Sequence, residues 1–166
     1  IVVNDTCESS VPGVYAVGDV NGGPQFTYVS LDDFRIVFGA LTGSGHYTLK
    51  DRKNIPYTTF LTPPLSRVGL TEEDAINQGY TIKTKEMLVA TMPRAHVNDY
   101  LKGAFKIVVD AENDLILGAT LYSQGAEELI NLIKMAMDNN IPYTYFKNQI
   151  FTHPTMAENL NDLCNF

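Results

Sequence analysis

The stretch that decides the fold runs from Ala104 to Asn140. It reads AFKIVVD over 104–110, AEND over 111–114, LILGATLYS over 115–123 and, after Gln124, GAEELINLIKMAMDNN over 125–140. Two apolar runs around a short polar loop are typical of an antiparallel hairpin, and the last segment has the apolar spacing of a helix. The stretch therefore predicts an α+β fold, a mainly antiparallel sheet with helices packed on it.

The flanking sequence extends both the sheet and its helices. Thr71, followed by three acidic residues, is typical of a capped helix start, and Gly79 would end that helix. We expect strands at 57–62, 66–70 and 80–91, and short helices after Pro142 and around 156–163.

The helix expected over 125–140 has apolar residues on more than one face. They are Leu129, Ile130, Leu132, Ile133, Met135, Ala136 and Met137. Because one buried stripe would not need them all, a partner is expected to cover a second surface. This pattern predicts a homodimer.

Residues 1–50 differ from the rest of the chain in their pattern of apolar and polar residues. We expect a short apolar strand over 14–17 and a helix over 28–41, where apolar residues recur at 31, 34, 38 and 41. The polar stretch 51–54 is expected to be a linker. The chain should therefore have two parts, residues 1–50 and residues 51–166.

Composition and charge exclude several classes of protein. The 166 residues carry a net charge of −7 and no basic block, so neither nucleic acid nor an anionic membrane is an expected partner. No apolar run approaches the roughly 20 residues of a membrane span. The start, IVVN, resembles the middle of a longer chain rather than a signal peptide. Cys7 and Cys164 have neither disulfide nor metal spacing, which favours free thiols and a cytoplasmic location.

The motif HPTMAE over 153–158 is the most informative for chemistry. His153 precedes a proline and should lie outside the following helix, whereas Glu158 falls just inside that helix and can turn back to the imidazole. A carboxylate bonded to one ring nitrogen fixes the tautomer and leaves the other nitrogen free for proton transfer. An exposed histidine in an ordinary helix turn is the alternative.

Gly18-Asp19 is a second candidate site. An Asp at the carboxyl end of a strand can bind a ribose or ribityl hydroxyl, although a plain turn is the commoner reason for such a dipeptide. The glycines that follow have neither the GxGxxG nor the GxxxxGK(S/T) spacing of a phosphate-binding loop. His46 and His96 show no ligand spacing, so no metal site is expected.

These motifs occur in one order that resembles the C-terminal part of the class I pyridine nucleotide-disulfide oxidoreductases. That family includes glutathione reductase, dihydrolipoamide dehydrogenase and mercuric reductase. The series is AVGD (16–19), FT (26–27), TPPLSRVGLTE (62–72), ILGA (116–119) and HPTMAE (153–158). The stretches TPPLSRVG (62–69) and QIFTHP (149–154) look most like the bacterial reductases that respond to reactive chlorine species and reduce hypothiocyanous acid.

The resemblance implies a role for each site residue. Gly18 and Asp19 match the second FAD fingerprint, in which the Asp carboxylate binds the ribityl chain. Thr27 matches a backbone N–H contact near the flavin. His153 and Glu158 match the acid–base pair that serves the redox disulfide of the partner subunit.

The resemblance also implies the organisation of a longer protein. Residues 1–50 would be the last part of an FAD-binding domain, and residues 51–166 the dimerisation (interface) domain. The homodimer would use FAD and NAD(P)H to reduce a small oxidant or a disulfide.

The motifs that this sequence lacks limit what it can do alone. Both GxGxxG fingerprints and the C-x4-C redox pair are missing, and Cys7 and Cys164 match neither redox position. We therefore expect this stretch by itself to bind no FAD tightly and to be inactive. The alternative is a free-standing dimerisation or ligand-binding module without redox activity. The intact pair His153 and Glu158 favours the reductase.

Overall fold

The computed structural model describes residues 1–166 and divides them into two units, residues 1–53 and residues 54–166. The sequence placed this division a few residues earlier. Arg52, from the expected linker, is bound into the first unit by ion pairs with Asp32 and Asp33.

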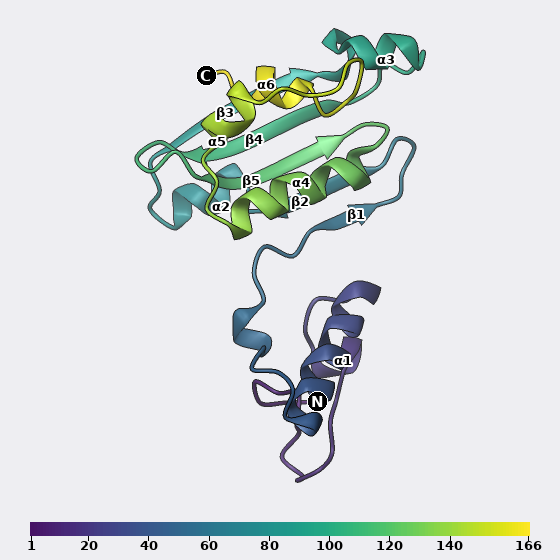
Figure 1. Ribbon diagram of the computed structural model, residues 1–166, viewed down its shortest axis with the longest axis vertical. Coiled ribbons are helices and arrows are strands. Elements are labelled where there is room, and N and C mark those ends of the chain that lie inside the picture. The colour runs from purple at the N-terminus through teal and green to yellow at the C-terminus, as the bar shows by residue number, and fades with distance from the viewer. The chain divides into compact units, whose positions relative to one another are not determined.

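The second unit is built on a five-stranded sheet in which every neighbouring pair is antiparallel (Figure 1). The strands are β1 (Tyr57–Thr59), β2 (Leu65–Gly69), β3 (Ile82–Leu88), β4 (Ala104–Asp110) and β5 (Ile116–Tyr122). Their order across the sheet is β1-β2-β5-β4-β3. The expected α+β fold with a mainly antiparallel sheet is thereby confirmed.

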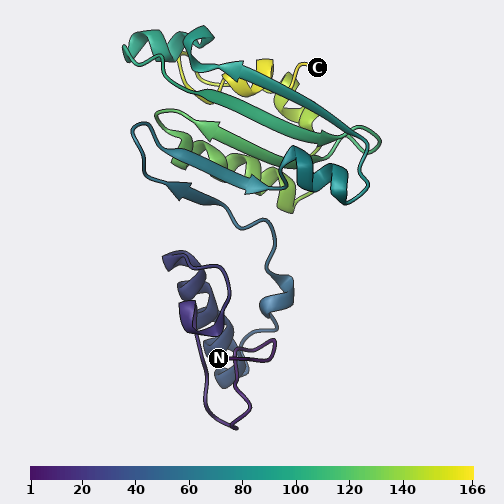
Figure 2. The same cartoon turned by 180° about the vertical axis from the view of Figure 1, so that it is seen from behind.

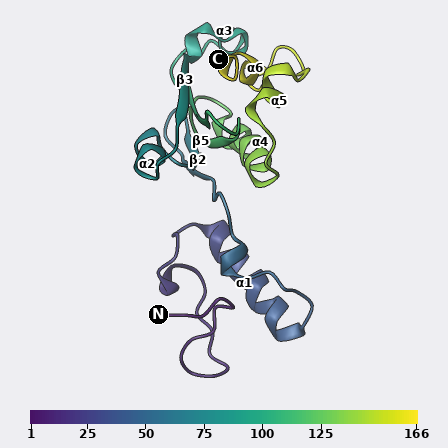
Figure 3. The same ribbon diagram turned by 90° about the vertical axis from the view of Figure 1, so that its left-hand side faces the viewer.

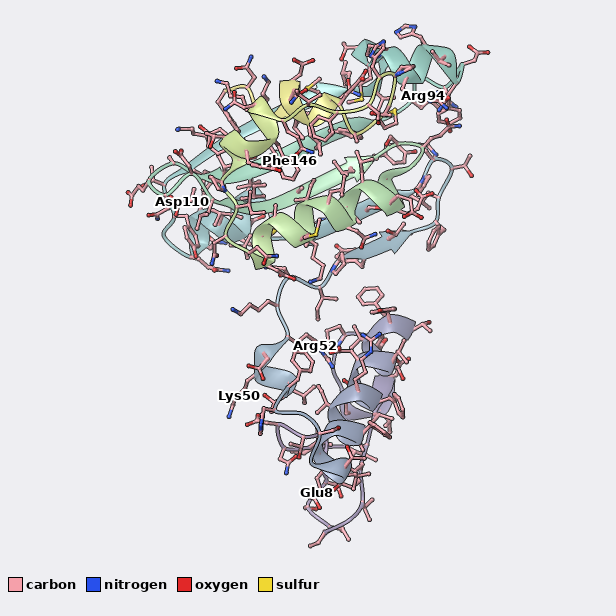
Figure 4. All side chains as sticks on the ribbon, viewed as in Figure 1. Glu8, Lys50, Arg52, Arg94, Asp110 and Phe146 are labelled. Atoms are coloured by element: carbon pink, nitrogen blue, oxygen red, sulfur yellow. The ribbon has the colours of Figure 1, made fainter.

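Side-chain hydrogen bonds close the central hairpin. The Asp110 carboxylate, labelled in Figure 4, accepts the backbone N–H of Glu112 at 2.8 Å and the side-chain amide of Asn113 at 2.7 Å. These bonds, the Asn113 side chain first, hold the pKa of Asp110 below its usual value, because they stabilise its charged form. The polar loop expected from AEND is therefore fixed from the end of β4.

Helices cover both faces of this sheet. They are α2 (Glu72–Asn77), α3 (Pro93–Val97), α4 (Ala126–Asp138), α5 (Tyr143–Asn148) and α6 (Asn159–Leu163). Seen edge-on, α2 lies on one side of the sheet and α4 and α5 lie on the other (Figure 3). The view from behind shows the face that carries α2 (Figure 2). As expected, Thr71 caps α2 by accepting the N–H of Asp74.

The core lies between the sheet and the α4 face. Alternate residues of β4 and β5 point into it because successive side chains of a strand face opposite ways. From the sheet it takes Phe105, Ile107, Val109, Ala119 and Leu121, and from the helices Leu129, Ile130, Ile133, Phe146, Leu160 and Leu163. Residues 54–166 therefore hold an extensive apolar interior of their own.

Most of the apolar residues of the helix α4 serve the core of their own unit. Ile133 is 0% exposed within its own unit, and Met137 packs against the same core. Met135 is the one large apolar side chain of α4 that is exposed, at 56%. Leu132 is only partly buried and, like Met135, lies outside that core, so these two residues form a smaller apolar surface whose cover by a partner stays a prediction.

Three strand expectations also need correction. The strand expected over 57–62 ends at Thr59. The strand expected over 80–91 stops at Leu88, and Val89–Thr91 form a 3-10 turn that leads into α3. Val89 and Met92 are buried, so the chain turns inward there instead of continuing along the sheet. The strand expected over 14–17 is absent, since its only pairing is an isolated bridge between Tyr15 and Glu8.

The first unit consists of one long helix and the loops around it. The helix α1 (Thr27–Thr42) follows a 3-10 turn, η1 (Gly18–Asn21), and a second 3-10 turn, η2 (Leu49–Asp51), comes after it. Its buried apolar side chains are Cys7, Ala16, Val29 and Ile36, and Asp33 is buried among them. In neither unit is any helix long and apolar enough to cross a membrane.

Candidate functional site

The sequence motif over 153–158 folds into a histidine–carboxylate pair. Nδ1 of His153 lies 2.9 Å from Oε2 and 3.1 Å from Oε1 of Glu158. The carboxylate is the more buried partner, since the Glu158 side chain is 16% exposed and the His153 side chain 72%. Nε2 of His153 has no hydrogen-bond partner. The geometry therefore directs one ring nitrogen to the carboxylate and the other to solvent.

This arrangement is suited to proton transfer. When Nδ1 carries the hydrogen and donates a hydrogen bond to Glu158, the ring is neutral and Nε2 keeps a free lone pair. Nε2 can then take up a proton and give it back while Nδ1 stays hydrogen-bonded to the carboxylate. His153 can therefore act as a base or an acid toward a group that approaches from solvent.

The loop that carries His153 is held by its own polar side chains. The hydroxyl of Thr155 donates to the carbonyl of Thr152 and accepts the N–H of Glu158. The Asn159 side chain, 3% exposed, donates to the carbonyls of Thr155 and Met156. These bonds fix the backbone between the histidine and the glutamate.

Two further side chains tie this loop to the rest of the unit. The Asn161 amide donates to the carbonyls of Phe146 at 2.6 Å and Gln149 at 2.9 Å, which joins α6 to the end of α5. From β3, Nζ of Lys85 donates to the carbonyls of Asp162 and Asn165. Both contacts therefore add side-chain donors to carbonyls at or beyond the ends of the two helices, where intrahelical bonds run out.

A hollow of about 330 Å³ lies beside the pair. Its lining comes from Pro93, Phe151, His153, Glu158, Asn159, Asn161 and Asp162. The carboxylate, the imidazole and the loop-holding amides therefore face one space.

The other site expected from the sequence lies in the first unit. Gly18 opens η1 with a φ of +71°, and a Cβ there would lie 2.8 Å from the Ser30 hydroxyl. Only glycine suits a position with both features. Its N–H donates at 2.7 Å to a carboxylate oxygen of the buried Asp33.

Asp19 and Thr27 both present unpaired polar groups. The Asp19 side chain is exposed and makes no hydrogen bond. Thr27 is the first residue of the 16-residue helix α1, which has no acidic residue in its first turn and no side-chain cap. The Thr27 N–H has no partner at this positive end of the helix. Asp19 is thus a free acceptor and Thr27 a free donor.

The structure brings together His153 and Glu158 in the second unit, and Gly18 with its neighbours in the first. Sequence reasoning missed the residues that hold these sites. They are Lys85, Asn159 and Asn161 for the histidine loop, and Asn21, Asp33 and Arg52 for the glycine turn. The sequence signal for the second group is that two adjacent acids, Asp32 and Asp33, lie inside an expected helix and need a cation, and that the expected linker carries Arg52.

Comparison with known proteins agrees with this description. Residues 55–164 match the family model described as pyridine nucleotide-disulphide oxidoreductase, dimerisation domain. The chain is 48% identical to the probable pyridine nucleotide-disulfide oxidoreductase RclA of Escherichia coli strain K12, covering 98% of this chain and 37% of RclA. It is 35% identical to the mercuric reductase of Lysinibacillus sphaericus, covering 96% of this chain and 29% of that enzyme.

A solved structure shows the same fold. It is the HOCl-induced flavoprotein disulfide reductase RclA from Escherichia coli, which matches with a TM-score of 0.95 over 98% of this chain and 38% of its own. The resemblance drawn from the sequence motifs is confirmed. The chain spans only about a third of the length of these relatives, 37% of RclA and 29% of the mercuric reductase.

Proposed function

The chain belongs to the pyridine nucleotide-disulphide oxidoreductase family, and on that premise we propose that it forms part of a homodimeric, flavin-dependent NAD(P)H:disulfide oxidoreductase. Residues 54–166 supply the dimerisation domain, and His153 with Glu158 supplies the acid–base pair for the redox disulfide of the partner subunit. The family uses FAD and NAD(P)H, and the FAD would provide the redox chemistry when it is bound.

The His153–Glu158 contact is the observation that carries this proposal. Glu158 orients the ring through Nδ1, so Nε2 can take a proton from a thiol and return it to the leaving sulfur or to a reduced product. A dimerisation module without redox activity would not need a half-buried carboxylate aimed at an exposed imidazole. The substrate class is a small oxidant or a disulfide.

The first unit fits a flavin in its donor and acceptor groups. The free Asp19 carboxylate suits a ribityl hydroxyl, and the unpaired N–H of Thr27 suits an electronegative edge of the flavin. Gly18 keeps the turn close to α1. No pyrophosphate-binding glycine loop occurs in this sequence, so the 166-residue chain alone should be colourless after purification. A stoichiometric yellow chromophore would contradict this part.

A reducing compartment, the cytoplasm, is part of the proposal. Cys7 and Cys164 are both free and buried, and they lie in different units. Such thiols persist where disulfides do not form.

Substitution of the pair in the full-length protein tests the proposal. His153→Gln should lower turnover by roughly 10²–10⁴-fold, the usual contribution of general acid–base catalysis, with FAD content and dimerisation retained. Glu158→Gln should cost less, because the imidazole remains. The matched control is His46→Gln, since His46 is exposed and makes no hydrogen bond. Equal turnover of the His153 and His46 variants would overturn the assignment.

A further inference from the structure

The buried carboxylate of Asp33 lies under the turn that carries Asp19. Asp33 is 0% exposed, and each of its oxygens is used. Oδ2 accepts the N–H of Gly18 at 2.7 Å and the side-chain amide of Asn21 at 2.8 Å. Oδ1 accepts from the Arg52 guanidinium. One side chain therefore joins both ends of η1 to a cation.

The two anchored residues flank Asp19 along the chain. Gly18 precedes Asp19, and Asn21 follows it by two positions. The other end of the Asn21 side chain accepts the N–H of Gly23 at 2.9 Å, so the anchoring extends beyond the turn. The backbone on each side of the exposed carboxylate is thus fixed, while the carboxylate itself has no protein partner.

Arg52 keeps this buried charge in place. Its side chain is 11% exposed and pairs with both Asp32 and Asp33, the first through Nε at 2.8 Å. Burial lowers the pKa of Arg52, and its hydrogen bonds to Asp33 and Asp32 more than offset this. The residue, labelled in Figure 4, comes from the end of the first unit and reaches back to α1. A buried carboxylate without such a partner would be costly.

We propose that Asp33, held by Arg52, is a positioning residue for FAD: it fixes the Gly18–Asn21 turn so that the Asp19 carboxylate is preorganised for the ribityl chain. The inference rests on the proposed function, because it takes Asp19 as a flavin contact. Asp33 itself does not touch the cofactor. Preorganisation lowers the ordering cost of binding, so loss of the anchor should weaken FAD affinity.

The chain offers a matched pair of variants for the test. Asp32 and Asp33 are adjacent and both pair with Arg52, yet only Asp33 contacts the turn. In the full-length protein, stripped of cofactor and titrated with FAD, Asp33→Asn should raise the Kd at least about tenfold, because hydrogen bonds to a charged group are lost. Asp32→Asn should change it by less than about twofold.

A second variant and a spectroscopic signal separate positioning from folding. Asn21→Ala removes one anchor but leaves Asp33 its charge, its bond from the Gly18 N–H and its ion pair with Arg52, and it should raise the Kd several-fold even if Asp33→Asn does not fold. Visible circular dichroism of bound FAD should change in Asp33→Asn and stay unchanged in Asp32→Asn. Equal Kd shifts for the two aspartates, or an Asn21→Ala variant that binds like the parent, would overturn the inference.

One more variant distinguishes a failure of the positioning role of Asp33 from a failure of the proposed function. Asp19→Asn should itself weaken FAD binding at least about tenfold. If it does and Asp33→Asn does not, the positioning role is wrong and the flavin contact stands. If Asp19→Asn has no effect, the flavin contact is wrong and the inference falls with it.

Discussion

The two units of the chain hold their functional loops by different means. Residues 54–166 fix the His153 loop with side-chain donors to backbone carbonyls, from Asn159, Asn161 and Lys85, over a large apolar core. Residues 1–53 fix the Asp19 turn with a buried ionic cluster and have few buried apolar side chains. Along α1 several large apolar residues are exposed instead, namely Tyr28, Leu31, Phe34, Phe38 and Leu41.

The difference shows which kind of interaction stabilises each unit. An apolar core stabilises by burial and needs no specific partner, whereas a buried ion pair roughly balances its own desolvation. The His153–Glu158 pair therefore lies on a unit whose own apolar core stabilises it. The turn in the first unit relies on a few specific contacts, which makes it the more easily perturbed of the two.

The largest expected effect concerns the units in isolation. Residues 54–166 alone should fold and unfold in one cooperative thermal transition, because their core is complete. Residues 1–53 alone should not, since four buried apolar side chains cannot offset the chain entropy of 53 residues. Circular dichroism of the two peptides measures this. A cooperative transition for residues 1–53 would break the comparison.

The next effect sharpens the role of α4. Ile133→Asp places a charge in the core and should lower the free energy of unfolding by about 4 kcal/mol or more. Met135→Asp, two positions along the same helix, should change it by no more than about 0.5 kcal/mol because Met135 is exposed. Urea denaturation of residues 54–166 compares them. Similar losses for the two variants would mean that α4 is not packed as described.

The smallest expected effect compares the two thiols. Burial raises the pKa of Cys164 to about 12, and burial followed by Asp33 raises that of Cys7. At pH 8 only about one Cys164 thiol in ten thousand would be ionised, so reaction requires opening of the structure. Cys7, in the unit with the smaller core, should react with a disulfide reagent first. Faster labelling of Cys164 would contradict the ranking of the units.

The same pKa shift sets a direction for stability with pH. In the unfolded chain Cys164 ionises near pH 8.5, whereas in the folded chain it keeps its proton up to about pH 12. The unfolded state then binds fewer protons between these values, so the free energy of unfolding falls as pH rises through this window. In Cys164→Ala this part of the slope should disappear, as urea titrations at pH 7.5 and 9.5 would show.

Much of the fold could be predicted because its signals are local. β4 begins and ends at the residues predicted, since its apolar run is bounded by a turn that Asp110 and Asn113 close themselves. The spacing predicted the helix α1 but not its buried face, because the residues at 31, 34, 38 and 41 are exposed and Val29 and Ile36 are buried instead. The end of β3 and the helix α3 could not be predicted in this way, because the burial of Val89 and Met92 depends on residues distant in sequence.

The candidate site divides in the same way. The contact between His153 and Glu158 spans five residues and follows from the motif. The anchors of the two loops span longer separations, 15 residues from Asn161 to Phe146 and 19 from Arg52 to Asp33. Such pairs are fixed by how α5 meets α6 and how the chain returns to α1, which no local pattern encodes.

The central claim is that the His153–Glu158 pair serves the active site of the partner subunit, and a mixed dimer tests it most directly. One subunit of the full-length protein would lack its redox cysteines, and the other would carry His153→Gln. With the pair acting on the partner, both lesions fall on one site, and the purified heterodimer should keep about half of the wild-type turnover. With the pair acting within its own subunit, neither site is intact, and an inactive heterodimer would contradict the account.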